Sequence, residues 1–411
     1  MSKLSRMFII QFLMLNILLS CKSRSIQATA TALQEVVPKA SIRFQQRKVF
    51  HFNQGTVAFS NTFAGARLNQ VTQLNDSTFK LLVEPENTPI NPSPWYAFKI
   101  WSAHQRRYIL QLTYVGTKHR YDPKLQLKNG AWKDVQPIEV SKDGNLASFG
   151  LEAGADSLLV TAQELMNSHD EYQWEDSLTK LPFVTRMEIG KSILGKAINA
   201  LNITESNGKK LIVILSRQHP PEVTGYMAMQ EFVRTVSGSS ALARSFRKAY
   251  EVVLVPMINP DGVDEGNWRH NIAGVDLNRD WENFIQPETK SVRDYILKKA
   301  DRQQAKVYFG IDFHSTYHDV FYTNEDQPLR QTNRPGFTLK WLKAFGESIP
   351  GFKPNIKPSP NGGNVSKSWM GRVLNAEALT YEVGDDTPRP TLKLKGRIAA
   401  EKMMELLLAE Q

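Results

Sequence analysis

Cysteine is nearly absent from the chain, since Cys21 is the only one among 411 residues. A single thiol cannot close an intramolecular disulfide, so the sequence excludes a disulfide-stapled fold and requires stabilisation by a hydrophobic core. Low-complexity tracts and internal repeats at solenoid or propeller periods are also absent, which excludes repeat architectures. With 41% hydrophobic and 22% charged residues, the composition is typical of a soluble globular protein, and the length favours two folded units.

Excess positive charge is scarce beyond the N-terminus. The net charge is +10, but residues 1–50 contribute seven of those charges, with eight Lys and Arg against Glu35 alone. The rest of the chain is therefore nearly balanced. This distribution excludes a broad phosphate-binding face, and we expect no nucleic-acid partner.

The N-terminus has the pattern of an export signal. "MSKLSRMFIIQFLMLNILLSC" places two cations before an apolar run, Met7 to Leu19, which is short for a membrane span. Its end resembles the lipobox of bacterial lipoproteins, in which Cys21 would be lipidated; an ordinary signal with a chance cysteine is the alternative. Residues 1–20 are then a signal peptide and 21–45 a basic tether, lying on anionic headgroups or simply solvated. We expect a lipoprotein anchored to the membrane of the bacterial cell envelope, at its periplasmic or outer-membrane face.

Two patterns of hydrophobicity divide the remaining chain. Residues 46–168 contain short β-branched and aromatic runs separated by turn residues, which predicts an all-β sandwich: "TVAFS", "STFKLLVEP", "WYAFKIWSA", "RYILQLTYV" and "SLLVTAQ". Residues 169–411 alternate aliphatic strands such as "KKLIVILS", "YEVVLVPMI", "KVYFGIDFHS" and "AEALTYEV" with helical stretches. That alternation predicts an α/β domain whose mixed central sheet is flanked by helices.

Polar residues stand at the ends of the aliphatic strands, where ligands bind in α/β sheets. His219, Asn259 and Glu382 each fall at or just after such an end. His219 and Glu222 flank two prolines that help to start a helix, and Zn²⁺ accepts both imidazole and carboxylate ligands. A His-x-x-Glu pair alone is common, so His314 at another strand end is the candidate third ligand. His318 lies past that strand and is more typical of a solvated loop.

The run from Asn259 to Trp281, "NPDGVDEGNWRHNIAGVDLNRDW", occurs with "HPPE" before it and with "DFHS" and "LTYEVGD" after it. Together these motifs resemble the zinc metallocarboxypeptidase family, over about residues 180–405. The likeness is greatest to the cytosolic-carboxypeptidase-like branch, whose members carry a β-sandwich domain before the catalytic one. The resemblance implies one Zn²⁺ per chain and a peptide substrate with a free C-terminal carboxylate.

Matching positions in this sequence receive roles from that resemblance. It implies His219, Glu222 and His314 as zinc ligands, with water in the fourth place. Asp276 is implied as the carboxylate that orients the first zinc histidine. Taken alone, Asp276 is better explained as a helix cap.

Four further residues are implied to act on the substrate. Asn278 and Arg279 match the pair that holds the terminal carboxylate, and a planar guanidinium suits that task. Arg269 matches the arginine that polarises the scissile carbonyl. Glu382 matches the general base that activates water at the zinc and then protonates the leaving amine. Arg269 and Arg279 could instead be surface cations and Glu382 an exposed acid at a strand end, but the joint match in the right order favours the metalloenzyme.

Two positions bear on the substrate. Lys367 lies 15 residues before Glu382, where the resembling branch has a basic residue that selects an acidic C-terminal side chain; a solvated lysine is the alternative. The digestive members' substrate-closing tyrosine has no counterpart in "KPSPNGGNVSKS", and Tyr317, Tyr322 and Tyr381 do not align with it.

Two other functions stay open at this point. A zinc amidohydrolase of the succinylglutamate desuccinylase and aspartoacylase type would act on small acylated amino acids, and a non-catalytic surface lipoprotein would only bind. Peptidoglycan stem peptides and imported peptides are equally compatible with the sequence as physiological substrates, and the sequence leaves the oligomeric state open.

Overall fold

The computed structural model describes residues 41–206, 208–325, 331–359 and 363–409. The signal sequence, Cys21 and most of the expected tether lie outside the described residues. Within them, no helix combines the length and apolarity needed to cross a bilayer. One boundary needs correction: Gln45, assigned to the tether, packs into the β-sandwich part, where its Nε2 donates to the Ala66 carbonyl at 2.5 Å.

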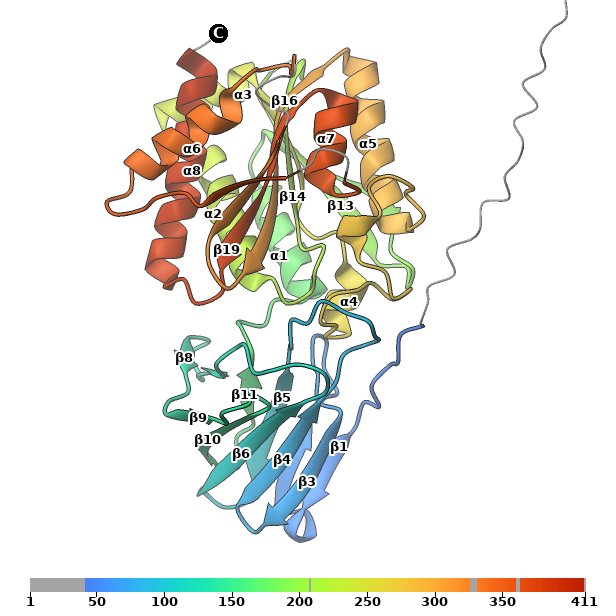
Figure 1. Cartoon of the computed structure of the whole chain (residues 1–411), viewed down its shortest axis with the longest axis vertical. Helices are drawn as coiled ribbons and strands as arrows, with labels where there is room; N and C mark the ends of the chain where they lie inside the picture. Colours follow the sequence, from blue (N-terminus) through green and yellow to red (C-terminus); the bar gives the residue numbers. More distant parts are fainter. Residues whose placement is uncertain (1–40, 207, 326–330, 360–362, 410–411) are drawn as a thin grey trace, which may run out of the picture. The chain divides into compact units, whose positions relative to one another are not determined.

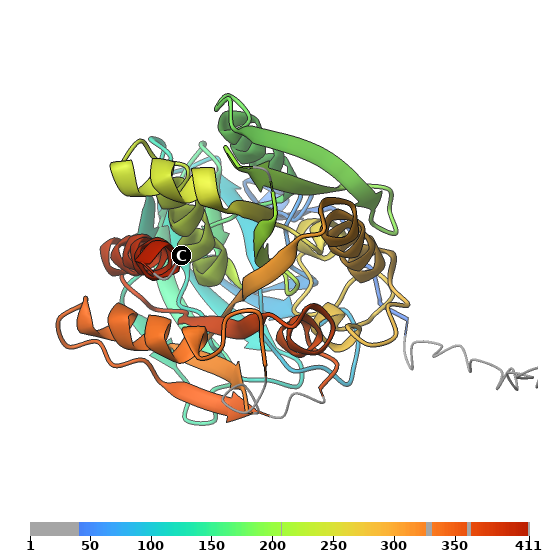
Figure 2. The same cartoon turned by 90° about the horizontal axis from the view of Figure 1, so that it is seen from above.

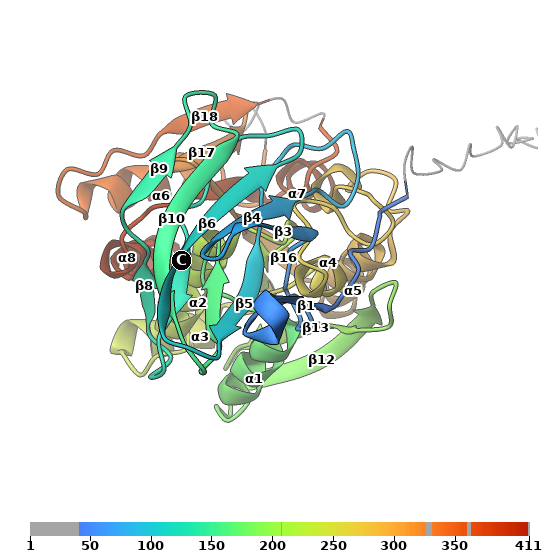
Figure 3. The ribbon, with the colours of Figure 1, turned by 90° about the horizontal axis from the view of Figure 1, so that it is seen from below.

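The N-terminal part is built from two β-sheets (Figure 1). The six-stranded sheet has the order β1 (Val49–Phe52), β2 (Val57–Ser60), β5 (Ala97–Ser102), β11 (Leu158–Thr161), β7 (Lys124–Gln126) and β8 (Trp132–Asp134), with a 3₁₀ turn η1 (Asn53–Gly55) between β1 and β2. The five-stranded sheet has the order β3 (Gln70–Asn75), β4 (Thr78–Val83), β6 (Arg106–Tyr114), β10 (Leu146–Ala153) and β9 (Ile138–Val140), visible side by side in Figure 3. The predicted β-sandwich is therefore present.

Alternation along the strands builds the sandwich core. In β6, Tyr108, Leu110, Leu112 and Tyr114 are buried while the residues between them are only half-buried. Successive side chains of a strand point to opposite faces, so one face of β6 packs on the other sheet. Phe59 and Phe79, from the two sheets, bring their ring centroids to 5.1 Å.

The C-terminal part contains one mixed eight-stranded sheet. Its order is β12 (Val184–Lys191), β13 (Ala197–Ile203), β15 (Glu251–Val255), β14 (Lys210–Ser216), β16 (Lys306–Thr316), β19 (Glu377–Gly384), β17 (Val320–Asn324) and β18 (Ile356–Ser359). The central strands β15, β14, β16 and β19 are parallel. The edge strand β12 was missing from the sequence prediction, because "VTRMEIGK" is mostly exposed and lacks an aliphatic run.

Helices cover both faces of this sheet (Figures 1 and 2). One face packs against α2 (Val223–Val236), α3 (Ala241–Ala249), α6 (Phe337–Glu347) and α8 (Arg389–Ala409), and the other against α5 (Pro287–Gln303) and α7 (Ser366–Leu374). Within β14, Ile212 and Ile214 face the first set while Leu211 and Val213 face the second. Burial on both faces explains why the central strands are continuous aliphatic runs, and it confirms the predicted fold class.

Short elements connect the sheet to its surroundings. Helix α1 (Ser168–Leu178) begins after Asn167, whose side chain accepts the backbone N–H groups of His169 and Asp170. Helix α4 (Pro260–Asp264) and the 3₁₀ turn η2 (Leu277–Arg279) lie in the connection between β15 and α5. The parallel strands β14, β16 and β19 end at one rim, which brings His219, His314 and Glu382 together.

Candidate active site

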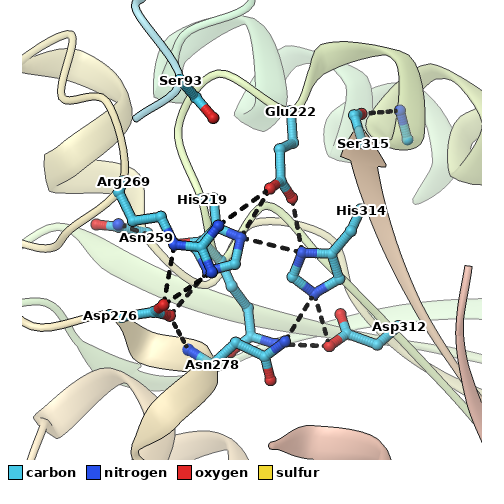
Figure 4. Close-up of polar contacts among 12 residues, drawn as sticks. Ser93, His219, Glu222, Asn259, Arg269, Asp276, Asn278, Asp312, His314 and Ser315 are labelled. Atoms are coloured by element: carbon cyan, nitrogen blue, oxygen red, sulfur yellow. Dashed lines mark hydrogen bonds and ion pairs between the residues drawn. The ribbon is translucent and has the colours of Figure 1, made fainter. Parts of the chain in front are cut away.

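The chain turns sharply between strand β14 and helix α2. Arg217, directly after the strand, has φ of 50°, in the left-handed region that a side chain rarely adopts. Pro220 and Pro221 form the turn that follows, and α2 begins only at Val223. The prolines thus lie in the turn directly before the helix. His219 and Glu222 leave this turn on the same side (Figure 4).

His219, Glu222 and His314 form one buried cluster. Glu222 lies between the two imidazoles: its Oε1 is 2.8 Å from His219 Nδ1 and its Oε2 is 2.6 Å from His314 Nδ1. The two Nδ1 atoms are 3.1 Å apart. One candidate ligand atom from each residue falls within 4.8 Å of the others, and all three residues are buried.

The outer nitrogens of both imidazoles face carboxylates. His219 Nε2 is 2.8 Å from Asp276 Oδ1, and His314 Nε2 is 2.8 Å from Asp312 Oδ2. A proton on each Nε2 satisfies these contacts and leaves both Nδ1 lone pairs directed into the cluster. Two nitrogen lone pairs and a carboxylate then converge without a proton between them.

This donor set fits a zinc ion. Two imidazole nitrogens and one carboxylate are the protein ligands of many catalytic zinc sites, and a cation resolves the convergence of three acceptors. Burial alone would raise the pKa of Glu222, but its contacts with His219 and His314 outweigh burial and hold the pKa below its ordinary value. The carboxylate is therefore ionised, as a metal ligand must be.

Asp276 connects the cluster to Arg269. Its Oδ1 faces His219 and also accepts the backbone N–H of Asn278 at 2.9 Å, while its Oδ2 accepts from Arg269 Nε at 2.9 Å. Burial would raise the pKa of Asp276, yet His219 and Arg269 hold it well below its ordinary range. The guanidinium is thereby fixed beside the cluster, with Nη1 3.9 Å from Glu222 Oε1.

The loop that carries Arg269 is held by the β-sandwich part. The buried carboxylate of Glu86 accepts the backbone N–H groups of Trp268, Arg269 and His270 at 2.7, 2.9 and 2.7 Å. Asn87 Oδ1 lies 2.6 Å from His270 Nδ1. Sequence reasoning missed Glu86, because 183 residues separate it from Arg269 and no local pattern marks the pair.

Asp312 was also missed, although a signal existed. It precedes His314 by two residues in β16, so both side chains project from the same face of the strand. Its Oδ2 accepts from Gln218 Nε2 at 2.6 Å and contacts the Ser366 hydroxyl. A buried Asp-x-His pattern in an aliphatic strand is the feature that points to it.

Asn278 and Arg279 lie on one wall of the site. Asn278 Oδ1 accepts the backbone N–H of Ser366 at 3.0 Å, and its Nδ2 is 3.3 Å from His314 Nε2. Arg279 is exposed and donates from Nη1 to the Asn278 carbonyl at 2.8 Å. Asn259, by contrast, caps α4 and donates to the Gln218 carbonyl, so it supports the turn instead of facing the cavity.

A cavity of about 460 Å³ opens over the cluster. It is lined by Asn91, Pro92, Ser93, Arg120, His219, Glu222, Arg269, Asn278, Arg279, Ser315, Thr316, Tyr317, Tyr322, Ser359, Val365, Lys367, Thr380 and Glu382. A larger cavity of about 520 Å³ lies elsewhere, around Phe63, Leu125 and Leu158, and contains none of the predicted site residues. The convergence of polar groups, and not size, marks the functional cavity.

Glu382 occupies the wall formed by β19. Thr380 and Glu382 are two residues apart and both line the cavity, while Tyr381 between them is buried in the core. Burial, followed by the charge of Glu222, raises the pKa of Glu382 to about 7. Its Oε2 atom is buried without a hydrogen-bond partner among the described residues.

Lys367 and the tyrosines differ in their placement. Lys367, on α7, is 3% exposed, lines the cavity and donates to Asn324 Oδ1 at 2.9 Å, so it is not a solvated loop lysine. Tyr317 and Tyr322 also line the cavity, whereas Tyr381 stacks on Phe321 in the core. His318 is exposed, as the sequence indicated.

Comparison with known proteins agrees with this geometry. Residues 171–348 match the zinc carboxypeptidase family (Peptidase_M14). Cytosolic carboxypeptidase 6 of Mus musculus is 25% identical over 363 residues, which cover 80% of this chain and 66% of that protein. Cytosolic carboxypeptidase 2 of Xenopus tropicalis is 27% identical over 51% of this chain, which spans only 22% of that protein's length.

Solved structures share the fold. A metallo-carboxypeptidase from Burkholderia cenocepacia aligns with TM-score 0.71 at 18% identity, over 87% of this chain and all of its own. A metallo-carboxypeptidase from Pseudomonas aeruginosa, solved with (2-guanidinoethylmercapto)succinic acid, aligns with TM-score 0.70 at 19% identity, over 86% and 100%. With the family match and the cytosolic carboxypeptidase homologues, these findings confirm the resemblance seen in the sequence: residues 171–348 of this chain match a zinc carboxypeptidase domain.

Proposed function

We propose that the protein removes single residues from the C-termini of peptides, with one Zn²⁺ held by His219, Glu222 and His314. The observation that carries this proposal is the convergence of two Nδ1 atoms and a carboxylate within 4.8 Å, at the floor of a cavity that also presents Glu382. A bound Zn²⁺ would act as a Lewis acid and lower the pKa of water at that site. The remaining chemistry belongs to side chains of this chain.

The side chains divide the work by position. Arg279 and Asn278 hold the substrate's terminal carboxylate on their wall of the cavity, and the guanidinium supplies paired donors. Arg269, fixed by Asp276 and Glu86, stabilises the negative charge that develops on the scissile carbonyl oxygen. Glu382 takes the proton of the attacking water and returns it to the leaving amine as the C–N bond breaks.

Glu382→Gln tests this assignment, because the amide keeps the shape but cannot accept the proton. We expect the variant to keep stoichiometric zinc and to lose about 10²–10⁴-fold in kcat on peptide substrates followed by mass spectrometry. N-acyl amino acids assayed in parallel separate a peptidase from an amidohydrolase. Undiminished peptide turnover by Glu382→Gln would remove Glu382 from its role, and cleavage of acylated amino acids alone would replace the peptidase by the amidohydrolase.

We also propose a preference for acidic C-terminal residues, supported by the placement of Lys367. A buried ammonium in the cavity wall favours a carboxylate side chain and disfavours a cationic one. For peptides ending in Glu, Leu and Lys, kcat/KM is expected to be highest for Glu. Lys367→Met should lower the Glu-to-Leu ratio about tenfold, equivalent to about 1.4 kcal/mol, while the exposed Lys248→Met leaves it unchanged. A wild-type preference for Leu ends this proposal.

Export and lipid anchoring through Cys21 remain a proposal, supported by the apolar run before the chain's only cysteine. Its physical basis is that an acyl chain on the mature N-terminus partitions into the bilayer. Cell fractionation should find the wild type in the membrane fraction and Cys21→Ser outside it. An equal distribution of both would contradict lipid anchoring.

A further inference from the structure

Two buried side chains flank the turn that carries two of the candidate zinc ligands. Arg217 directly follows the end of β14 and precedes His219 by two residues. Tyr226 lies in the first turn of α2, four residues after Glu222. Arg217 is 2% exposed and Tyr226 is 1% exposed, and neither is among the residues that line the cavity. Any effect of Arg217 on the reaction must therefore act through the residues next to it.

The two side chains contact each other across the turn. The guanidinium carbon of Arg217 lies 5.1 Å from the centroid of the Tyr226 ring, a cation–π distance. This contact joins the residue that enters the turn to the helix that leaves it. The segment between them, which contains His219 and Glu222, is thereby closed into a loop whose two ends are held together.

The start of helix α1 holds this loop from outside. Arg217 Nη2 donates to the Met166 carbonyl at 3.1 Å, just before the helix. The Tyr226 hydroxyl donates to Glu171 Oε2 in the first turn of α1. The Tyr226 ring also meets the Trp174 ring edge-on, with the centroids 6.3 Å apart. Both ends of the loop are therefore attached to one short stretch of the chain.

Arg217 is unfavourable for the stability of the fold. Its φ of 50° is a strained conformation that persists only where the surroundings fix it. Its Nε and Nη1 atoms are buried without a hydrogen-bond partner among the described residues, and burying a charge with incomplete hydrogen bonding is unfavourable. Stability alone gives little reason for an arginine at this position, whereas strained and poorly satisfied residues are typical of functional sites.

We propose that Arg217 is a positioning residue of the metal site. Stacked on Tyr226, its guanidinium holds the turn closed and so sets the separation of the ligands His219 and Glu222. This inference rests on the proposed zinc site and adds to it the device that keeps two of the three ligands in place before the metal binds.

The zinc affinity of the full chain, measured by titration against a fluorescent chelator, tests this role. Arg217→Met removes the stacked cation and should weaken zinc binding about 10- to 100-fold, the range typical of residues that orient metal ligands. Arg217→Lys should recover only part of the affinity, because an ammonium group keeps the charge but not the planar stack.

Tyr226 gives independent access to the same contact. Tyr226→Phe keeps the ring and loses only the bond to Glu171, so it should retain most of the zinc affinity. Tyr226→Leu removes the ring and should weaken zinc binding as much as Arg217→Met does. The double variant should be no worse than either single variant, because both changes remove the same contact. If Arg217→Met fails to fold, the comparison of Tyr226→Leu with Tyr226→Phe decides the matter.

Arg247→Met is the matched control. Arg247, on α3, is also 2% exposed and also stacks on an aromatic ring, with Cζ 3.9 Å from the Phe183 centroid. It donates to the Val236 and Gly238 carbonyls and to Glu205, and it does not line the cavity. We expect Arg247→Met to lower the stability measured by urea unfolding and to leave the zinc affinity unchanged.

The possible failures are distinguishable. Wild-type zinc affinity in folded Arg217→Met or Tyr226→Leu, or an equal loss of affinity in Arg217→Met and Arg247→Met, overturns this inference and leaves the proposed function standing. A purified wild type that binds no zinc overturns the proposed metal site itself.

Discussion

Gly225 has no room for a side chain. It lies in the first turn of α2, three residues after Glu222, where the helix crosses strand β16. A Cβ atom at this position would be 2.2 Å from the His314 carbonyl oxygen, 2.6 Å from its carbonyl carbon and 3.0 Å from its nitrogen. These are backbone atoms of a central strand, so no flexible side chain can move aside.

Gly225→Ala therefore forces the helix away from the strand. Ordinary contact begins near 3.4 Å, so the oxygen contact alone requires a shift of about 1 Å. The change separates Glu222, directly before the helix, from His314 on the strand, and misplacement of a reacting group by about 1 Å costs about 100-fold in rate. Overpacking should also destabilise the fold by about 1–3 kcal/mol, although alanine is intrinsically the better helix former by about 1 kcal/mol.

Three measurements test this prediction: zinc affinity by competition with a chelator dye, kcat/KM, and unfolding in urea. Gly346→Ala is the control, because its Cβ would also be too close to a neighbour, at 2.6 Å from Pro354 Cδ, but in α6 and away from the cluster. Both variants should lose stability, and only Gly225→Ala should lose zinc affinity and activity. A folded Gly225→Ala protein with wild-type zinc affinity and turnover would refute the reasoning.

Three further predictions follow from the same structure. Glu86→Gln should lower kcat about tenfold or more and leave KM nearly unchanged, since each lost charge-assisted hydrogen bond to the Arg269 loop is worth about 1.5–3 kcal/mol. The control is Glu84→Gln, at a half-buried position. Equal steady-state kinetics for the two variants would contradict the prediction. Burial, aided by the negative charge of Asp261, raises the pKa of Glu288 from 4.5 to about 7. Protonated Glu288 therefore stabilises the fold fully below pH 4.5, and this stabilisation is lost as the pH rises through 7. Glu288→Gln should remove about 3 kcal/mol of that dependence, and equal slopes of unfolding free energy between pH 5 and 8 in both proteins would disprove it. Removing zinc with a chelator should destabilise the wild type by about 2.7 kcal/mol, relative to protein at a free zinc concentration of 100 times Kd. The same treatment should leave the stability of His314→Ala unaffected. Thermal shifts of equal size in the wild type and the variant would rule out His314 as a ligand.

The sequence by itself determined the elements of the fold and the order of the candidate ligands. Two kinds of signal are local: the period-two alternation in β6 and the continuous aliphatic runs in β14 and β16. In each case the apolar pattern within the strand itself indicates which of its faces are buried. The motif around His219 and the "DLNRDW" segment are equally local, so their residues could be named without coordinates. Strand β12 was not predicted, because an exposed edge strand carries no apolar pattern.

Only the tertiary structure decided which distant residues meet. Glu86 and Arg120 enter the site from the first part of the chain, 183 and 265 positions away from the partners they bind. Gly225 is critical only because β16 passes beneath it. Such contacts depend on how sheets and helices pack across long chain separations, whereas sequence patterns report burial over a few neighbouring residues. The ligands of the candidate metal site were therefore predictable, and the residues that hold them in place were not.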